Sequence, residues 1–281
     1  MIDLSKASQA AEQAAYAAGT HLLASRSRLA EMVITHKQPG DVASEIDREA
    51  EALIRGVVMK RFPDHGFVGE ESGSTLDDGR PLWVVDPLDG TANYLRGYPQ
   101  YAVSIALVVE GEPQVGVVYD PCRNEFFGAI RGRGAVLNGA LIHCAPPRPT
   151  IEAMAATVFP KPGSPRMASY MTELGRVLRA FGGVRRSGSM ALEMAYLAAG
   201  RIDAFWEHDM GVWDAAAGIV LMRESGAVVQ ARDSAPLLRS RSLMASTPGL
   251  LPTFAALLDP RDPLDKPDPL RPEHRGLTAT L

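Results

Sequence analysis

The chain has 281 residues, of which 46% are hydrophobic, and its formal net charge is −4. This length and apolar content allow one or two domains with a substantial core, and the charge gives no electrostatic case for nucleic acid as the main ligand. Two cysteines, Cys122 and Cys144, are too few for a disulfide framework. No segment resembles a membrane span or a signal core, so we expect a cytoplasmic protein without membrane contact.

The first part of the chain predicts two helices. Alanines at helical spacing favour a helix over 5–26, and a polar loop is expected at 36–41. Ser44 is the expected N-cap of the second helix, with Asp47 at its third position as in a capping box. Apolar residues from Ile46 onward recur at the spacing of one buried helix face.

The pattern then switches to strands. Apolar runs predict strands at 82–86, 101–109, 114–119 and 125–130. Pro87 and Gly90 predict that the chain turns just after the first of these strands. Asn138-Gly139 is typical of a two-residue hairpin turn.

Beyond the Pro146-Pro147 pair, strands and helices alternate. The expected strands are 152–158, 184–186, 202–206 and 227–231, and the expected helices are 166–181, 190–199 and 215–225. Antiparallel strands after two helices, followed by alternating units, predict an α+β half over 1–145 and an α/β half over 146–258. Repeated Asp-Pro pairs without apolar periodicity favour a flexible tail at 259–281.

Acidic residues gather where apolar segments end. Asp86 and Asp89 stand three residues apart at the end of a buried strand, and Glu70 and Glu71 follow a short apolar stretch. Asp214 stands at the mouth of an apolar helix. Like charges this close are costly unless a cation lies between them, and hard divalent cations prefer carboxylate oxygens. We therefore expect one converging cluster of oxygen ligands.

These motifs resemble the signatures of the inositol monophosphatase family, whose members are magnesium-dependent, lithium-sensitive phosphomonoesterases. The matching stretches are Gly69-Glu70-Glu71-Ser72, Asp86-Pro87-Leu88-Asp89-Gly90-Thr91 and Trp213-Asp214. Three more stretches resemble the bacterial inositol-1-monophosphatase branch: 116–121, 124–127 and 134–139. The resemblance implies a layered αβαβα sandwich of the inositol monophosphatase and fructose-1,6-bisphosphatase type, and a homodimer.

The resemblance also implies a ligand set for two Mg²⁺ ions. Glu70, Asp86 and the backbone carbonyl of Leu88 would hold one ion. Asp86, Asp89 and Asp214 would hold the second, so that Asp86 bridges the two. Considered singly, Glu70 could instead be a solvated loop acid and Asp214 a plain helix N-cap.

Glu70, Thr91 and Asp47 form the catalytic set that the resemblance implies. Thr91 would hydrogen-bond the attacking water, and Asp47 would orient Thr91, because a hydroxyl is a weak base that gains from a carboxylate partner. The alternative for Asp47 is a first-turn carboxylate that the helix dipole favours. Lys37 matches a family loop lysine near the site, although loop lysines are usually solvated.

The substrate candidates are Asp89, Gly90, Thr91, Arg185, Gly188, Ser189 and Glu207. Gly188 and Ser189 precede a helix whose free N–H groups suit an anion or a hydroxyl. Arg185 and Arg186 either contact substrate or belong to a subunit interface.

Glu207 follows the strand expected at 202–206, so we expect it to emerge at the strand end, on the rim of the site. A carboxylate there suits the vicinal hydroxyls of a polyol, and the inositol-specific branch carries a Glu at the matching position. The alternative is a solvated edge acid. His208 departs from the family pattern, and we expect it to be exposed and without a role.

The leading hypothesis is hydrolysis of myo-inositol 1-phosphate to myo-inositol and phosphate by a metal-activated water. Rival substrates within the superfamily are fructose 1,6-bisphosphate, histidinol phosphate and nucleotide 3′-phosphates. A rival of another class is a regulatory binding protein on the same scaffold that engages the transcription machinery. The intact set of acids argues against a purely non-catalytic role.

Overall fold

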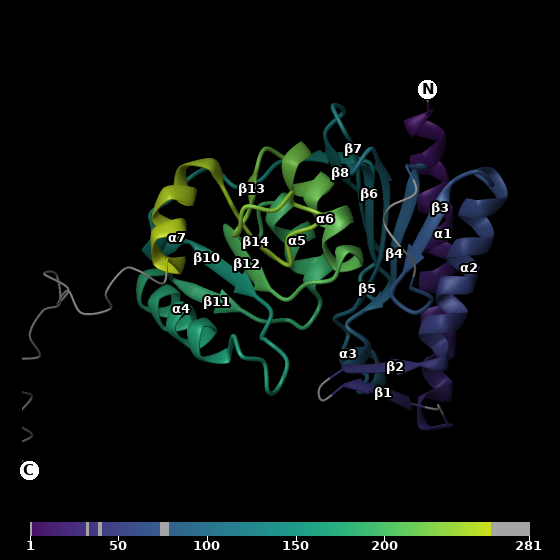
Figure 1. Ribbon diagram of the computed structural model, residues 1–281, viewed down its shortest axis with the longest axis horizontal. Coiled ribbons are helices and arrows are strands. Elements are labelled where there is room, and N and C mark those ends of the chain that lie inside the picture. The colour runs from purple at the N-terminus through teal and green to yellow at the C-terminus, as the bar shows by residue number, and fades with distance from the viewer. Residues whose placement is uncertain (1, 32–33, 39–40, 74–78, 260–281) are drawn as a thin grey trace, which may run out of the picture.

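Five layers of helices and sheets make up the fold. The computed structural model describes residues 2–31, 34–38, 41–73 and 79–259. The layers alternate helix–sheet–helix–sheet–helix across Figure 1, which confirms the expected α+β/α/β sandwich. Within the described residues, no helix is both long and apolar enough to cross a membrane.

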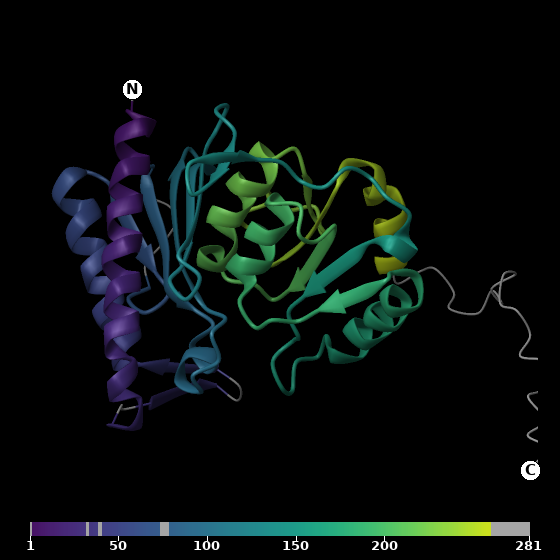
Figure 2. The ribbon, with the colours of Figure 1, turned by 180° about the vertical axis from the view of Figure 1, so that it is seen from behind.

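The first layer consists of α1 (Leu4–Ser25) and α2 (Glu45–Arg61), which lie side by side against the larger sheet (Figure 2). The alanine stripe of α1 is fully buried, because small side chains let the helix lie close to the sheet. A Cβ atom at Gly19 would come within 2.5 Å of the Tyr119 ring, so the approach there requires glycine. The helix predicted over 5–26 is confirmed.

A short antiparallel ribbon lies between α1 and α2 in the chain order. It consists of β1 (Ile34–Gln38) and β2 (Asp41–Ser44), after a 3₁₀ turn η1 (Arg26–Glu31). The prediction of a polar loop at 36–41 is therefore wrong for the residues described, because backbone pairing brings them into strands. The backbone of Lys37 lies in β1, and its side chain falls outside what the structure describes.

The second layer is a seven-stranded sheet whose strands follow one another in chain order. They are β3 (Gly66–Gly69), β4 (Leu82–Asp89), β5 (Ala102–Val109), β6 (Glu112–Asp120), β7 (Glu125–Ile130), β8 (Ala135–Leu137) and β9 (Ala140–Ile142). β3 runs parallel to β4, and the other described neighbours are antiparallel. Asn138 and Gly139 have φ values of 49° and 81°, so they form the predicted hairpin turn.

β4 is longer than the strand predicted at 82–86. The proline within it does not end the strand, because pairing with β5 continues to Asp89 with one irregularity after Asp86. The chain turns instead at Gly90, whose φ of 98° favours glycine. A short helix, α3 (Thr91–Leu95), follows at once.

The third layer consists of α5 (Met190–Ala198) and α6 (Val212–Glu224), enclosed between the two sheets. Both helices are apolar on nearly all sides because they are buried on both faces. At Gly116 of β6 a Cβ atom would lie 2.4 Å from the Ala217 carbonyl oxygen, so α6 packs directly on the backbone of the larger sheet.

The fourth layer is a five-stranded sheet with the order β11-β10-β12-β14-β13. Its strands are β10 (Met154–Thr157), β11 (Gly183–Arg185), β12 (Ala204–His208), β13 (Val228–Ala231) and β14 (Ser242–Ser246). β10 runs parallel to β11 and β12, whereas β14 is antiparallel to both of its neighbours. The sequence analysis did not predict β14, because its short apolar run lies among serines and arginines.

The fifth layer consists of α4 (Met167–Ala180) and α7 (Leu251–Leu258), which cover the outer face of this sheet. Two 3₁₀ turns, η2 (Thr150–Glu152) and η3 (Pro248–Leu250), lie beside them in the sequence. The helix expected at 166–181 is confirmed, and α7 was not predicted. The tail predicted at 259–281 lies outside the described residues apart from Asp259.

Candidate active site

The end of β4 presents two carboxylates on one side of the larger sheet. Residues three apart on a regular strand face opposite sides, but Asp86 pairs with Ser104 and Asp89 pairs with Ala102. Three steps on β4 therefore match two steps on β5, which is a β-bulge. The Asp86 carboxylate accepts a hydrogen bond from the Leu88 N–H at 2.9 Å, which stabilises the bulge. The Asp-Pro-Leu-Asp segment thus places both carboxylates on the same side of the larger sheet.

Glu70 and Asp214 reach Asp86 from two other elements. Glu70 follows β3, and because β3 and β4 are parallel, their carboxyl ends meet at one edge of the sheet. Asp214 stands in the first turn of α6 and accepts a hydrogen bond from the Gly211 N–H at 2.7 Å. One carboxylate oxygen from each of Glu70, Asp86 and Asp214 lies within 4.8 Å of the others. We call these three residues the acidic cluster.

The helix predicted at 215–225 begins three residues earlier, at Val212. Asp214 is therefore inside the helix, in its first turn, and Gly211 takes the N-cap position. The alternative of a plain N-cap aspartate is wrong for this reason.

Within the cluster, burial and the neighbouring carboxylates raise the pKa values of Asp86 and Asp214. Burial raises the pKa of Asp86 well above its usual range, and the three neighbouring acids raise it further. Burial and the charges of Glu70 and Asp89 raise the pKa of Asp214 to about 8. Three carboxylates that repel one another and supply only oxygen ligands fit a hard divalent cation.

Asp89 is held differently from the acidic cluster. Its Oδ2 accepts hydrogen bonds from the Ser189 hydroxyl at 2.5 Å and from the Ala191 N–H at 2.7 Å. Burial raises the pKa of Asp89, and these hydrogen bonds oppose the rise. The N-terminus of α5, predicted to be free for substrate after Gly188 and Ser189, is therefore partly occupied by Asp89.

Thr91 and Asp47 lie in contact, although they come from α3 and α2. The Thr91 hydroxyl is 2.8 Å from Asp47 Oδ1 and 3.1 Å from the Leu88 carbonyl oxygen. Asp47 is 1% exposed. When Thr91 donates its single proton to Asp47, its oxygen is left as an acceptor toward the site.

Glu51 was missed by the sequence analysis. It lies one helical turn after Asp47 on α2, and its Oε2 accepts a hydrogen bond from the Glu71 N–H at 2.9 Å. A Cβ atom at Gly69 would overlap the Glu51 carboxylate, so glycine is required there. The spacing of four residues from Asp47 was the available signal. Glu51 fixes the loop that carries Glu70.

Asn93 joins the two halves of the chain at the site. Its Nδ2 donates to the Gln100 carbonyl at 2.7 Å and to the Ser187 carbonyl at 2.9 Å. Gly90 and Gly188 make this approach possible: a Cβ at Gly188 would lie 2.7 Å from Asn93 Nδ2. The loop before α5 is thereby fixed beside the end of β4.

Glu207 lies inside β12, which continues to His208. The prediction that it emerges at a strand end on the rim is wrong, since its side chain is buried and only 4% exposed. Among the described residues, its Oε2 has no hydrogen-bond partner. Burial raises the pKa of Glu207 well above its usual range, and the charge of Asp214 adds to this.

The two arginines after α4 point to different neighbours. Arg185 is exposed and donates to the Val184 carbonyl at 3.2 Å. The Arg186 guanidinium lies 5.1 Å from the centre of the Phe159 ring, and its charge acts on Glu207. The geometry therefore favours Arg186 over the predicted Arg185 as the arginine beside Glu207.

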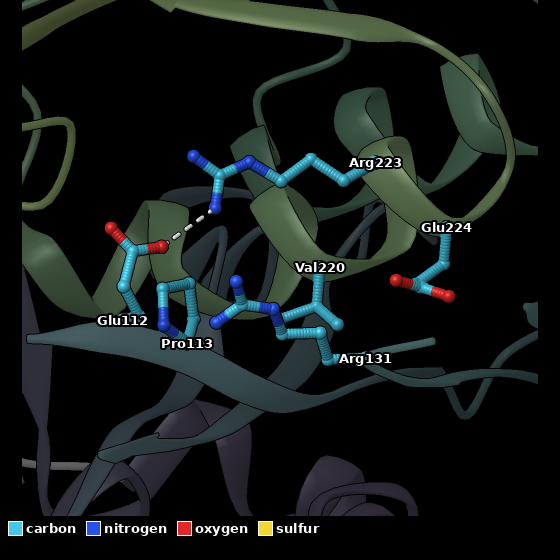
Figure 3. A pocket seen from close by; sticks show the side chains of 6 residues that line it. All are labelled: Glu112, Pro113, Arg131, Val220, Arg223 and Glu224. Atoms are coloured by element: carbon cyan, nitrogen blue, oxygen red, sulfur yellow. Dashed lines mark hydrogen bonds and ion pairs between the residues drawn. The ribbon is translucent and has the colours of Figure 1, made fainter. Parts of the chain in front are cut away.

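A cleft of about 440 Å³ lies at the other end of α6 (Figure 3). It is lined by Glu112, Pro113, Arg131, Val220, Arg223 and Glu224. Its acids already have partners: Arg223 pairs with Glu112 at 3.0 Å, and Glu224 accepts two backbone N–H groups. The cleft is therefore separate from the acidic cluster, which stands at the first turn of α6.

Fold and site together define a class, the layered αβαβα hydrolases with carboxylates at the junction of sheet and helix. A model of the inositol monophosphatase family matches residues 3–260. The chain belongs to the inositol monophosphatase family, and by class it is a phosphatase.

Relatives within the family carry two kinds of name. An inositol-1-monophosphatase of Rhizobium meliloti is 41% identical over 215 residues, covering 76% of this chain and 81% of the relative. A Nus factor SuhB of Xylella fastidiosa is 44% identical over 217 residues, covering 77% and 78%.

Solved structures agree with the fold. The extragenic suppressor protein SuhB of Bartonella henselae superposes with a TM-score of 0.86 at 36% identity, covering 90% of this chain and 98% of that one. An inositol monophosphatase of Anabaena gives a TM-score of 0.78 at 32% identity, covering 92% and 96%.

Proposed function

We propose that this chain is a Mg²⁺-dependent phosphatase that hydrolyses the phosphate monoester of a polyol, with myo-inositol 1-phosphate as the leading substrate. The observation that carries the proposal is the acidic cluster, in which carboxylate oxygens of Glu70, Asp86 and Asp214 lie within 4.8 Å of one another. The Thr91–Asp47 pair and the buried Glu207 add a water-orienting group and a hydroxyl acceptor.

Glu70, Asp86 and Asp214 would hold the cation, and the Leu88 carbonyl and Asp89 are the further ligands expected for a two-ion site. Bound Mg²⁺ would neutralise the phosphate charge and lower the pKa of a bound water. Binding to Asp89 would compete with the Ser189 hydroxyl for a carboxylate oxygen.

The chain's own groups would orient the water. Thr91 donates to Asp47, so its oxygen can accept a hydrogen bond from the attacking water. Glu70 would accept a hydrogen bond from the second O–H of that water. Such positioning is a large part of the catalysis in phosphate ester hydrolysis.

Substrate choice would rest on Glu207. Its buried carboxylate with an unpaired oxygen suits hydroxyl donors, and a polyol carries several. Relatives named inositol-1-monophosphatase support the same substrate class. Gly90, Gly188 and Ser189 would border the phosphate, and Arg186 rather than Arg185 would border the polyol.

We also infer a cytoplasmic homodimer inhibited by lithium, on the strength of the family membership. The direct test of the proposed function is phosphate release from a panel of phosphomonoesters, measured with Mg²⁺ and with excess chelator. Release from myo-inositol 1-phosphate that vanishes with chelator supports the proposal. No release from any member of the panel refutes it.

A second function is favoured by one observation, the relatives named Nus factor SuhB at up to 44% identity. We propose that the chain could in addition bind a component of the transcription machinery. A binding isotherm with RNA polymerase, measured beside phosphatase activity, separates the two functions. Absence of binding at micromolar concentrations would remove this second function.

A further inference from the structure

A second buried group of polar residues lies on the outer face of the five-stranded sheet. It consists of Glu173 from α4, His208 from β12, Arg232 just after β13 and Ser242 from β14, and we call it the His208 cluster. The side chains of His208, Glu173 and Arg232 are 7%, 6% and 11% exposed. The prediction that His208 is exposed is therefore wrong.

Arg232 is the centre of this group. Its Nη2 donates to Glu173 Oε1 at 2.6 Å and to the Leu258 carbonyl at 3.0 Å, at the end of α7. Its Nη1 lies 3.1 Å from Glu173 Oε2 and 2.6 Å from His208 Nε2. Burial alone would raise the pKa of Glu173, but its contacts with His208 and Arg232 lower it.

The His208 ring links Arg232 to the backbone of β12. Its Nε2 lies 2.6 Å from Arg232 Nη1 and 2.9 Å from Glu173 Oε2. Its Nδ1 lies 3.1 Å from the Ser242 hydroxyl, which donates to the Glu207 carbonyl at 3.0 Å. The ring thus connects the Glu173–Arg232 pair to the backbone of Glu207 through Ser242.

The two faces of β12 connect this group to the proposed substrate carboxylate. Successive residues of a strand face opposite sides, so His208 faces α4 and α7 while Glu207 faces α5 and α6. The hydrogen bond from Ser242 to the Glu207 carbonyl fixes the backbone from which the Glu207 side chain projects. A change in the His208 cluster would shift the direction of that side chain.

We propose that His208 is a positioning residue for substrate recognition: through Ser242 it holds the backbone of Glu207, so that the Glu207 carboxylate can meet the polyol hydroxyls. The inference rests on the proposed phosphatase function. It concerns the affinity for the polyol and leaves the metal site unchanged.

The test compares two esters, myo-inositol 1-phosphate and p-nitrophenyl phosphate, in three proteins: wild type, His208→Leu and His208→Gln. The measured quantity is the ratio of the two kcat/KM values. We expect His208→Leu to lower this ratio roughly tenfold, mostly through KM for the inositol ester. His208→Gln should keep the ratio within about twofold, because its amide oxygen still accepts from Arg232.

His21→Gln is the matched control. His21 Nε2 lies 2.9 Å from Glu49, and Arg28 lies 3.6 Å from the same carboxylate oxygen, so the same three residue types meet in the other half of the chain. This variant should leave the ratio unchanged. Ser242→Ala provides a second, smaller change in the same hydrogen-bond chain, should His208→Leu fold poorly, and should lower the ratio in the same direction.

Equal losses on both esters in His208→Leu or Ser242→Ala would overturn the inference, as would a loss of the ratio in His208→Gln as large as in His208→Leu. A wild-type protein that hydrolyses neither ester would refute the proposed function instead. In that case calorimetric binding of myo-inositol 1-phosphate to wild type and His208→Leu would decide the positioning claim, with equal affinities against it.

Discussion

Two groups of buried charged residues differ in how their charges are balanced. In the acidic cluster, the carboxylates of Glu70, Asp86 and Asp214 face one another, and the pKa of Asp86 is raised. In the His208 cluster, Glu173 meets Arg232 directly, and its pKa is lowered. The first group brings charges of one sign together, whereas in the second a carboxylate and a guanidinium offset each other.

The comparison separates function from stability. A buried carboxylate without a counter-charge costs folding free energy, so its presence indicates a ligand. A buried carboxylate that is paired and hydrogen-bonded holds elements together, and here it joins α4, β12, β13 and α7. Substitutions in the two groups should therefore affect different properties.

The largest expected effect is on turnover in the acidic cluster. Asp86→Asn should lower kcat by roughly 10⁴-fold, about 5.5 kcal/mol, because the amide cannot supply the charge that holds the cation. Folding, followed by circular dichroism, should stay intact, since the substitution removes a repulsive charge.

Asp120→Asn is the control for this substitution. Asp120 is equally buried, but it is paired with Arg123 at 2.7 Å and lies outside the acidic cluster. The variant Asp120→Asn should have a lower free energy of unfolding than wild type and an unchanged kcat. Near-normal turnover in Asp86→Asn, or full wild-type activity in excess chelator, would contradict the metal site.

The next effect is on stability in the His208 cluster. Glu173→Ala should lower the free energy of unfolding by about 3–5 kcal/mol, because it leaves the Arg232 charge buried and unpaired. Urea unfolding measures this loss. The double variant Glu173→Leu with Arg232→Met removes both charges and should lose less. A double variant less stable than the single one would show that the charge pairing is not the cause.

A smaller effect concerns Glu207 and the selectivity between two phosphate esters. Glu207→Ala should cost about 1–3 kcal/mol of transition-state binding for myo-inositol 1-phosphate, the scale of a hydrogen bond to a charged group. Activity on p-nitrophenyl phosphate should barely change. Steady-state kinetics on both esters provide the measurement, and equal losses would mean that Glu207 supports the whole site instead of reading the polyol.

The smallest effect is on the pH dependence of stability without metal. The pKa of Asp214 is raised from 3.8 to about 8 in the folded protein, so the unfolded state ionises first as the pH rises through this interval. The folded state consequently loses stability between these values, and Glu173, with its lowered pKa, adds stability above its unfolded pKa and loses it in acid.

Thermal unfolding measures whether stability changes with pH in this direction. Added Mg²⁺ should raise Tm by about 3 °C more at about pH 8 than at about pH 5, because the ionised cluster binds the cation better. The variant Asp86→Asn should lose most of this difference. A larger Mg²⁺ effect at the lower pH would contradict the interpretation of the cluster.

Local pattern alone was enough for much of the fold. The alanine spacing of α1, the apolar runs of β5 to β7 and the Asn138-Gly139 turn follow from short-range preferences, and the structure has them within a few residues. The acids at segment ends were also visible, because ends of parallel strands and of helices meet at one edge of a layered fold.

Tertiary structure decided what depends on long-range contacts. The strand pattern indicated a turn after Asp86, but pairing with β5 turned the segment into a bulge that aims Asp86 and Asp89 the same way. Glu207 and His208 were predicted to follow the end of a strand at 202–206. The strand continues through them because it pairs with β14, where Ser242 lies 34 residues after His208 and the sequence pattern predicts a strand only weakly. Glu173 and Arg232 are 59 residues apart, and no local spacing predicts that they meet. The neighbours of a charge are settled by the packing of distant elements, and so the chain's sequence determined which acids are present while the fold determined which of them gather in the acidic cluster and which meets Arg232.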